Sequence, residues 1–456
     1  MTDPSIGVGW FHVRAPDQGD WDERVSGSLS RDHDWLSVTL LQDRDEARPT
    51  AEDLSIEAVA GFLPDEEVLL FQVQRSGWTV RYGTQKPSTR HLRARTAVHG
   101  LSISALSEIH PVSVEAHFHG VGVWSGLAGA TETNTTDPTT GLLMGFSMQL
   151  QSSPGVVVAL HDGLELELGT TWSVDGPAGH RAVRSPASIK VRASSGEPRP
   201  VGDLLEPLFA VQDLMNCAHG AFIPATGGRA DFRRTEQGAA LIANRDWPLH
   251  GVLWNGGLAE ARPGATRLDG VDAPGRAMLG LASVGGVEAL PRWIDMLRRH
   301  RRPLSPLVDR FRHGAPYDFA EFLTLVAACE AWMQTFASKT DYQGQKFNLG
   351  MATVAGPHFK EWCGGYLREW AAEVTKLNQL LKHVARGDDP DPWHLSVIVE
   401  ALWTLLLCNT MNYLAGSMTP SEHIVTSVQR NDLGRRLRRL LQERSAEYEA
   451  KEPSTT

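Results

Sequence analysis

The chain has 456 residues, of which 41% are hydrophobic and 21% are charged, and its formal net charge is −10. At about 150 residues per domain this length predicts two or three domains, each large enough to bury a core. No apolar run approaches the roughly 18 to 20 residues that span a bilayer, so a membrane protein is not expected. The negative charge argues against a protein that coats nucleic acid through bulk charge, and any such contact must be a local patch.

The cysteines indicate a reducing compartment. The chain holds 4 cysteines, which are scattered and form no CxxC pair. The N-terminus has no charged and then apolar segment of the kind found in secretory signals. We therefore expect a cytoplasmic protein with neither a disulfide framework nor a zinc ribbon.

The first part of the chain, up to about residue 200, has the pattern of β-strands. Short runs rich in Val, Ile, Thr and aromatic residues recur between Gly, Pro, Asp and Ser breaks. The candidate strands are 25–29, 35–41, 68–74, 78–82, 112–124, 146–150, 156–168 and 189–193. Asp162-Gly163 is typical of a tight hairpin turn within one of these runs. The simplest architecture is a β-sandwich or a strongly curved antiparallel sheet.

Helical spacing replaces this pattern further along the chain. It first appears at 204–220, which predicts a helix that closes the β-rich domain. Residues 223–290 are rich in Gly, Ala and Arg and hold short extended pieces, and we expect irregular structure there, packed on the same domain. The prediction is thus an α+β protein, with a β-rich domain at 1–290 and an all-α helical bundle at 291–456.

Capping residues mark the helices of the bundle. The expected helices begin at Asp318, span 366–385, run from Asp391 to Gly416, and begin again at Thr419. Asp391-Pro392 is an N-cap followed by the residue favoured at the first helical position. The helix that follows it is apolar nearly all round in its middle, which predicts the most buried helix of the bundle.

Three patterns outside any known motif could bind ligands. His117 and His119 would share one face of a strand, but no third metal ligand is recognisable, and a solvated face is the simpler interpretation. The arginines of 298–302 could bind phosphate or simply end a helix. The arginines of 435–439 could face RNA or a partner, or lie on a plain amphipathic surface helix.

A family resemblance rests on residues in a fixed order along the chain. Gly9-Trp10-Phe11 followed by 25–29 resembles the entry of the N-terminal domain of ApeA-like antiphage proteins. The further segments that fit this order are 111–119, 122–124, 204–220, 280–293 and 302–304. The segment 319–332 looks like the first helix of an ApeA-type HEPN domain. The resemblance implies a bacterial defence protein that acts by abortive infection. Its β-rich half would sense or position, and its HEPN half would cut RNA.

HEPN ribonucleases carry an Arg, then four to six residues, then a His. RNA can be cut without a metal when a His moves the proton of the ribose 2′-hydroxyl and a cation stabilises the charge on the phosphate. In this sequence the corresponding helix offers Lys376 and His383, which are seven residues apart and so lie on nearly one face. The resemblance implies that His383 is general base or acid, Lys376 or Lys382 the phosphate cation, and Asn378 a positioning residue.

This match departs from the family pattern, because the first position is Lys, a point charge without the bidentate fork of Arg. Two other segments resemble the motif. Arg245 and His250 have the right spacing, but Pro248 would break the helix on which the motif normally lies. Arg430-Asn431 has the right opening pair, but Arg435 follows where the His is needed. His383 could also be a polar residue near a helix C-terminus, where a protonated imidazole is favoured.

The resemblance also implies partners and leaves two rival functions open. The partners would be RNA, such as tRNA or other host or phage RNA, a phage-derived trigger, and a second copy in a homodimer or higher oligomer. No cofactor, metal or membrane is expected. One rival is a non-catalytic HEPN-like protein that binds RNA or a partner. The other is a β-sandwich recognition module whose helical bundle serves only for dimerisation.

Overall fold

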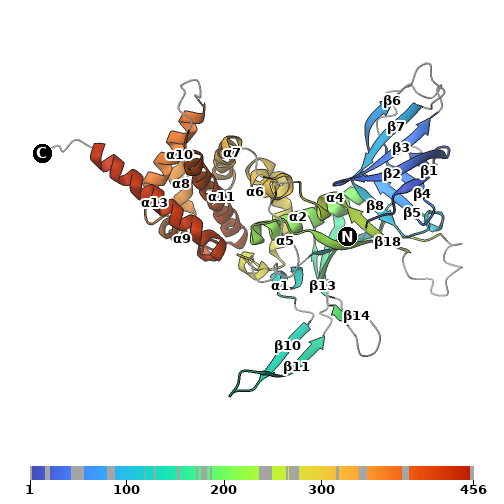
Figure 1. Cartoon of the computed structure of the whole chain (residues 1–456), viewed down its shortest axis with the longest axis horizontal. Helices are drawn as coiled ribbons and strands as arrows, with labels where there is room; N and C mark the ends of the chain where they lie inside the picture. The colour runs from blue at the N-terminus through green and yellow to red at the C-terminus, as the bar shows by residue number, and fades with distance from the viewer. Residues whose placement is uncertain are drawn as a thin grey trace. The chain divides into compact units, whose positions relative to one another are not determined.

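The computed structural model describes residues 3–15, 21–42, 56–79, 88–118, 120–127, 130–150, 155–170, 173–175, 182–184, 187–235, 249–262, 265, 277–314, 318–337, 347–382 and 390–451. Its contacts divide the chain into two compact units. The sheet unit comprises residues 1–122, 127–212 and 224–261, and the helical unit comprises 123–126, 213–223 and 262–456. Figure 1 shows the strands of the one and the helices of the other, and the α+β prediction is therefore confirmed.

Fourteen strands of the described residues form one antiparallel sheet in the sheet unit. In spatial order they are β12 (Val156–Ala159), β13 (Leu164–Thr170), β16 (Ala187–Ala193), β9 (Ser113–Phe118), β17 (Ala225–Phe232), β18 (Leu249–Asn255), β8 (Thr96–His99), β5 (Glu67–Phe71), β4 (Ala58–Phe62), β1 (Gly7–Arg14), β2 (Val25–Asp32), β3 (Trp35–Gln42), β7 (Ser88–Ala94) and β6 (Gln74–Thr79). Two separate hairpins pair β10 (Ala130–Thr136) with β11 (Leu143–Leu150), and β14 (Ser173–Asp175) with β15 (Ala182–Arg184).

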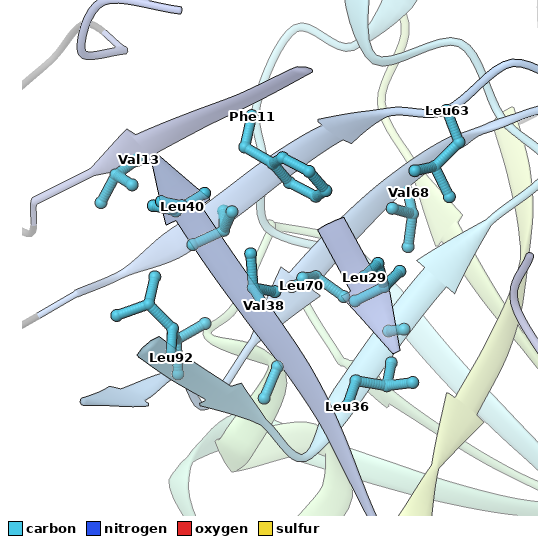
Figure 2. Close-up of a cluster of buried hydrophobic side chains, with 14 of the residues drawn as sticks. Phe11, Val13, Leu29, Leu36, Val38, Leu40, Leu63, Val68, Leu70 and Leu92 are labelled. Atoms are coloured by element: carbon cyan, nitrogen blue, oxygen red, sulfur yellow. The ribbon is translucent and has the colours of Figure 1, made fainter. Parts of the chain in front are cut away.

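The sheet curves around a core of its own side chains. Phe11 of β1, Leu36 of β3 and Trp254 of β18 belong to one buried cluster, although several strands separate them in the sheet order. Figure 2 shows this cluster, in which the ring of Phe11 lies among aliphatic side chains. A Cβ added at Gly61 would lie 2.8 Å from the ring of Phe11, so the ring occupies the space that the glycine leaves. Of the two predicted architectures, the sheet unit has the curved antiparallel sheet.

Three local predictions can be compared with the strands. The hairpin at Asp162-Gly163 is confirmed, because both residues have positive φ, 62° and 70°, and join β12 to β13. The strand expected over 112–124 ends instead at Phe118, since Gly120 has a φ of 71° and α1 (Val121–Ser125) follows. The irregular structure expected over 223–290 is wrong at β17 and β18, which lie within the sheet between β9 and β8.

The helices of the described residues lie mostly in the second half of the chain. Besides α1, they are α2 (Val201–His219), α4 (Gly256–Ala259), α5 (Ala289–Arg299), α6 (Arg301–His313), α7 (Asp318–Phe336), α8 (Phe347–Val354), α9 (Pro357–Trp362), α10 (Leu367–Lys382), α11 (Pro392–Ala415), α12 (Thr419–Thr426) and α13 (Val428–Lys451). α2 crosses from the sheet unit to the helical unit between Gln212 and Asp213. α11 contacts α7, α12 and α13 and is the central helix of the helical unit.

Local capping explains the bounds of α11. The Asp391 side chain accepts a hydrogen bond from the backbone N–H of Trp393 at 3.3 Å, Pro392 occupies the first turn, and Gly416 ends the helix with a φ of 67°. By length and composition α11 could cross a membrane, contrary to the expectation that no run is long enough. Its most apolar window is 89% buried inside the structure, which is typical of a core helix.

Candidate functional site

Of the residues predicted to cut RNA, Lys376, Asn378 and Lys382 lie in the C-terminal half of α10. Trp370, Val374 and Leu377 are buried, and they fix which side of the helix faces the core. Lys376 therefore faces solvent, with 58% of its side chain exposed. Lys382, also exposed, is the last residue of the helix. His383 and Gly387 lie outside the described residues.

Asn378 occupies a different side of the helix from Lys376. Two positions along an α-helix are separated by a rotation of about 200° around its axis, so the two side chains point in nearly opposite directions. Asn378 is half-buried, and its buried Oδ1 accepts no hydrogen bond from the described residues. Asn378 and Lys376 are thus not placed to hold the same phosphate group.

A buried carboxylate one turn before Lys376 gathers charged side chains from three helices. Glu373 of α10 is 1% exposed, and its Oε1 lies 3.9 Å from the Lys376 ammonium and 3.3 Å from Nε2 of His394 in α11. Its Oε2 lies 3.9 Å from Nε of Arg444 in α13. We call these four residues the Glu373 cluster. It combines a histidine, a lysine and an arginine around one acid.

The buried imidazole of His394 is harder to protonate than an ordinary histidine. Burial lowers its pKa below the ordinary value of 6.5, and the positive charges of Arg444 and Lys376 act in the same direction, against the opposing effect of Glu373. Nδ1 lies 3.4 Å from Nη2 of Arg444, while Nε2 faces the Glu373 carboxylate. A guanidinium can only donate, so Nδ1 accepts the hydrogen bond from Arg444. Nε2 of His394 and both oxygens of Glu373 make no hydrogen bond with the described residues.

The cluster presents cations to solvent and keeps its acid inside. Lys376 and Arg444 are 58% and 28% exposed, whereas His394 and Glu373 are 7% and 1% exposed. An anion from solvent can reach the two cations without meeting the carboxylate directly. Trp393, the neighbour of His394, is 47% exposed, and surface aromatic rings of this kind stack on nucleic-acid bases.

Arg444 is the functional candidate that the sequence did not single out. The α10 segment has Lys where the HEPN pattern has Arg, and the guanidinium at the Glu373 cluster comes instead from α13. The sequence singled out the arginines of 435–439, which lie on the same helix, but not Arg444. The guanidinium offers the planar fork that Lys376 lacks.

Arg430, the second motif-like arginine, has a structural role. Its Nη1 donates to Oε2 of Glu400 at 2.9 Å, and its side chain is 11% exposed. Its guanidinium lies 4.5 Å from the ring centre of Trp403, and that of Arg310, which also bonds Glu400, lies 4.9 Å from it. Burial alone would raise the pKa of Glu400, but the two guanidiniums outweigh it and lower that pKa.

His250, the histidine of the third motif-like segment, belongs to the sheet. It lies in β18, and its Nδ1 is 2.6 Å from Oδ1 of Asp231. Asp231 is 4% exposed and also bonds Ser113, Lys190 and Arg229, so the carboxylate links four strands. Arg245 and Pro248 lie outside the described residues. A strand at His250 is not the helix on which the HEPN motif normally lies.

Of the two histidines predicted to share a strand face, His117 lies in β9. His117 Nε2 contacts Oε1 of Glu115 at 3.1 Å, whereas His119 lies outside the described residues. Among the residues that the structure describes, no group of three His, Cys, Asp or Glu is placed to hold a metal ion.

Comparison with known proteins identifies the front half of the chain. The family model for ApeA N-terminal domain 1 matches residues 5–239, which is more than half of the chain and spans β1 to β17. No curated protein and no solved structure matches the chain. Residues 240–456, with the Glu373 cluster, lie beyond the matched segment. The chain therefore belongs to the ApeA N-terminal domain 1 family, that of ApeA-type antiphage defence proteins.

Proposed function

We propose that the helical unit is a HEPN-type, metal-independent endoribonuclease, and that the protein defends a bacterium by cutting RNA after phage infection. The observation that supports this is the Glu373 cluster, where Lys376 and Arg444 reach solvent from α10 and α13. In the sequence His383 comes directly after Lys382, the last residue of α10, and it is seven residues from Lys376. The proposed site is thus His383, Lys376 and Arg444, with Lys382, the residue before His383, as an alternative phosphate cation.

In this mechanism His383 moves protons and the two cations bind the phosphate. The neutral imidazole removes the proton of the ribose 2′-hydroxyl, and the 2′-oxygen attacks the neighbouring phosphorus. The bond from phosphorus to the 5′-oxygen breaks, and that oxygen takes a proton from an imidazolium. The products are a 2′,3′-cyclic phosphate and a 5′-hydroxyl. Lys376 and Arg444 stabilise the negative charge that develops on the phosphate oxygens.

Glu373 and His394, the buried members of the cluster, position Lys376 and Arg444. Glu373 attracts Lys376 and Arg444 toward one point, and the lone pair of His394 faces Arg444. Because these two groups are buried, they act on the cations and not on the RNA. We assign Asn378 no contact with the phosphate.

The proposal extends to the setting of the reaction. It places the protein in the cytoplasm, with host or phage RNA as substrate and a phage-derived trigger acting on the family-matched half of the chain. A second copy of the chain would bring a second His383 to the site, as in HEPN dimers.

A phage-challenge assay tests the proposal in cells. Wild type is compared with Lys376→Ala, His383→Ala and Arg444→Ala at matched protein levels, with total RNA profiled after infection. Arg439→Ala is the matched control, because Arg439 also lies on α13 but is 80% exposed and pairs with Glu443. We expect the three variants to lose both protection and RNA fragments and the control to keep both. Protection that survives all three substitutions would overturn the proposal and favour a non-catalytic binding protein.

A further inference from the structure

The hairpin of β10 and β11 forms a sheet of its own within the sheet unit. No other strand of the described residues pairs with either of its edges, and Figure 1 shows it apart from the strands of the main sheet. Each strand therefore presents, along its outer edge, a row of backbone N–H and C=O groups for which the described residues supply no neighbouring strand. A two-stranded hairpin alone is marginally stable in water, and a stable sheet needs at least one further strand.

A defined turn presents apolar side chains at the tip of this hairpin. The Asp137 carboxylate accepts a hydrogen bond from the backbone N–H of Thr139 at 2.7 Å, which is the usual contact of an aspartate that starts a turn. Three consecutive apolar residues follow the turn and are 66%, 60% and 70% exposed, namely Leu142, Leu143 and Met144. Contiguous exposed apolar side chains at the end of a projecting element are typical of a contact with another protein.

The charge of the hairpin decides which kind of partner it fits. Residues 130–150 contain no Lys, Arg or His, and they contain two acids, Glu132 and Asp137. Nucleic acids and anionic lipid surfaces attract basic side chains, so neither is complementary to this segment. A protein strand that adds to the edge of a sheet needs only backbone groups and side chains without opposing charge. The hairpin therefore fits a protein partner.

The two edges of the hairpin differ in charge. β11 has the sequence LMGFSMQL, with no charged residue and no proline, so nothing in it opposes the addition of a strand. β10 carries Glu132, and charged residues in an edge strand are a common protection against pairing. An uncharged strand is complementary to a second copy of itself, because antiparallel pairing about a two-fold axis then brings no like charges together.

We propose that β11 pairs in antiparallel orientation with β11 of a second copy of this chain, so that two hairpins form one four-stranded sheet. Because the two strands run in opposite directions, the tip of each hairpin lies beside the base of the other. The apolar residues at the tip are then covered by the second copy. The inference goes beyond the nuclease proposal, because it names a contact between two sheet units. It is tested by assembly alone, so its failure would leave the nuclease proposal standing.

Sedimentation velocity of the full-length chain over a range of concentrations tests this inference. The test variant is Ser147→Lys with Gln149→Lys, which places like charges where two copies of β11 meet. The matched control is Thr133→Lys with Thr135→Lys, which adds the same charge at exposed positions of β10. We expect wild type and the control to form dimers of equal stability, and the test variant to associate at least about tenfold more weakly.

Three results of this experiment would overturn the inference. The first is a wild-type chain that stays monomeric at about 100 µM. The second is a dimer of the test variant that is as stable as that of wild type, because another surface would then hold the two copies together. The third is a control that weakens the dimer as much as the test variant does, because the effect would then not be specific to β11.

Chemical cross-linking locates the contact, because the native cysteines are all buried and only an introduced one can react. In the proposed pair the two copies of Ser147, near the middle of β11, lie about 5 to 8 Å apart. The two copies of Thr133, which pairs with Ser147 inside the hairpin, lie three strand spacings or roughly 14 Å apart. A short bismaleimide reagent should therefore link Ser147→Cys into covalent dimers and leave Thr133→Cys unlinked. Absence of the link in Ser147→Cys would contradict the inference, whether or not Thr133→Cys is linked.

Discussion

His219 makes the helical unit sensitive to acid. The side chain lies at the C-terminus of α2, is 2% exposed, and neither ring nitrogen has a hydrogen-bond partner among the described residues. Burial lowers its pKa from 6.5 to about 4. The folded protein therefore holds this imidazole neutral at pH values where the unfolded chain already binds the proton.

The sign and size of the effect follow from linkage. A histidine with a lowered pKa contributes its full stability above pH 6.5 and loses it as the pH falls from 6.5 toward 4. At about 1.36 kcal/mol per pH unit, the gap corresponds to about 3 kcal/mol of unfolding free energy. His219→Leu removes the titrating group and keeps an apolar side chain in its place. The difference in stability between the variant and wild type should therefore change by about 3 kcal/mol between pH 7 and pH 4, in favour of the variant.

Urea denaturation followed by circular dichroism at the helical band measures this difference at each pH. Comparing two proteins at the same pH cancels the contributions of other titrating groups, such as Asp231. His423→Leu controls for the loss of an exposed imidazole. A difference between His219→Leu and wild type that stays constant from pH 7 to pH 4 would refute the reasoning.

Two further predictions concern stability and use the same assay. Arg430→Met should lower the unfolding free energy by about 2 kcal/mol, because it removes one of the two guanidiniums that pair with the half-buried Glu400. Arg435, which is 72% exposed, pairs with Asp432 at the surface, so Arg435→Met should cost less than about 1 kcal/mol. Equal losses of unfolding free energy in Arg435→Met and Arg430→Met would contradict the role given to the pair of Arg430 and Glu400. Gly256→Ala should cost at least about 2 kcal/mol, since the added Cβ would lie 1.9 Å from a backbone oxygen. At Gly77 the nearest atom is 3.9 Å away, so Gly77→Ala should cost much less, and a similar loss would contradict the packing described.

Features that depend on neighbouring residues could be predicted from the sequence. Asp391 and Gly416 bound α11 as expected, because helix caps are set by the residues at the helix ends. The turn at Asp162-Gly163 follows from the tolerance of these two residues for positive φ. The change from a β-rich to a helical pattern gave the α+β class.

Features that depend on residues distant in the sequence could not be predicted from the sequence. β17 has the pattern Gly-Gly-Arg within it and looks irregular on its own, but β9 and β18 pair with it along most of its length. Strand pairing of this kind overrides weak local propensity. The sequence pattern of Val121 and Trp124 predicts a continuation of β9. In the structure Gly120 turns the chain, and both residues are buried on one side of a short helix.

The candidate site also has one part that the sequence could predict and one part that it could not. The solvent-facing position of Lys376 follows from the apolar stripe of α10 and could be predicted. The approach of His394 and Arg444 to Glu373 depends on how three helices pack, which no local spacing encodes. Arg430 shows the converse, since an arginine with a motif-like neighbour proves to be a buried partner of Glu400.

Cleavage of RNA by the full-length protein purified from phage-infected cells, in the presence of excess EDTA, tests the central claim most directly. The fragment ends are analysed for wild type, His383→Ala, Arg444→Ala and the Arg439→Ala control. The account predicts fragments with 2′,3′-cyclic phosphate and 5′-hydroxyl ends from wild type and the control, and a loss of at least about 100-fold in rate for the other two. Cleavage that EDTA abolishes, or that persists unchanged in both His383→Ala and Arg444→Ala, would contradict it.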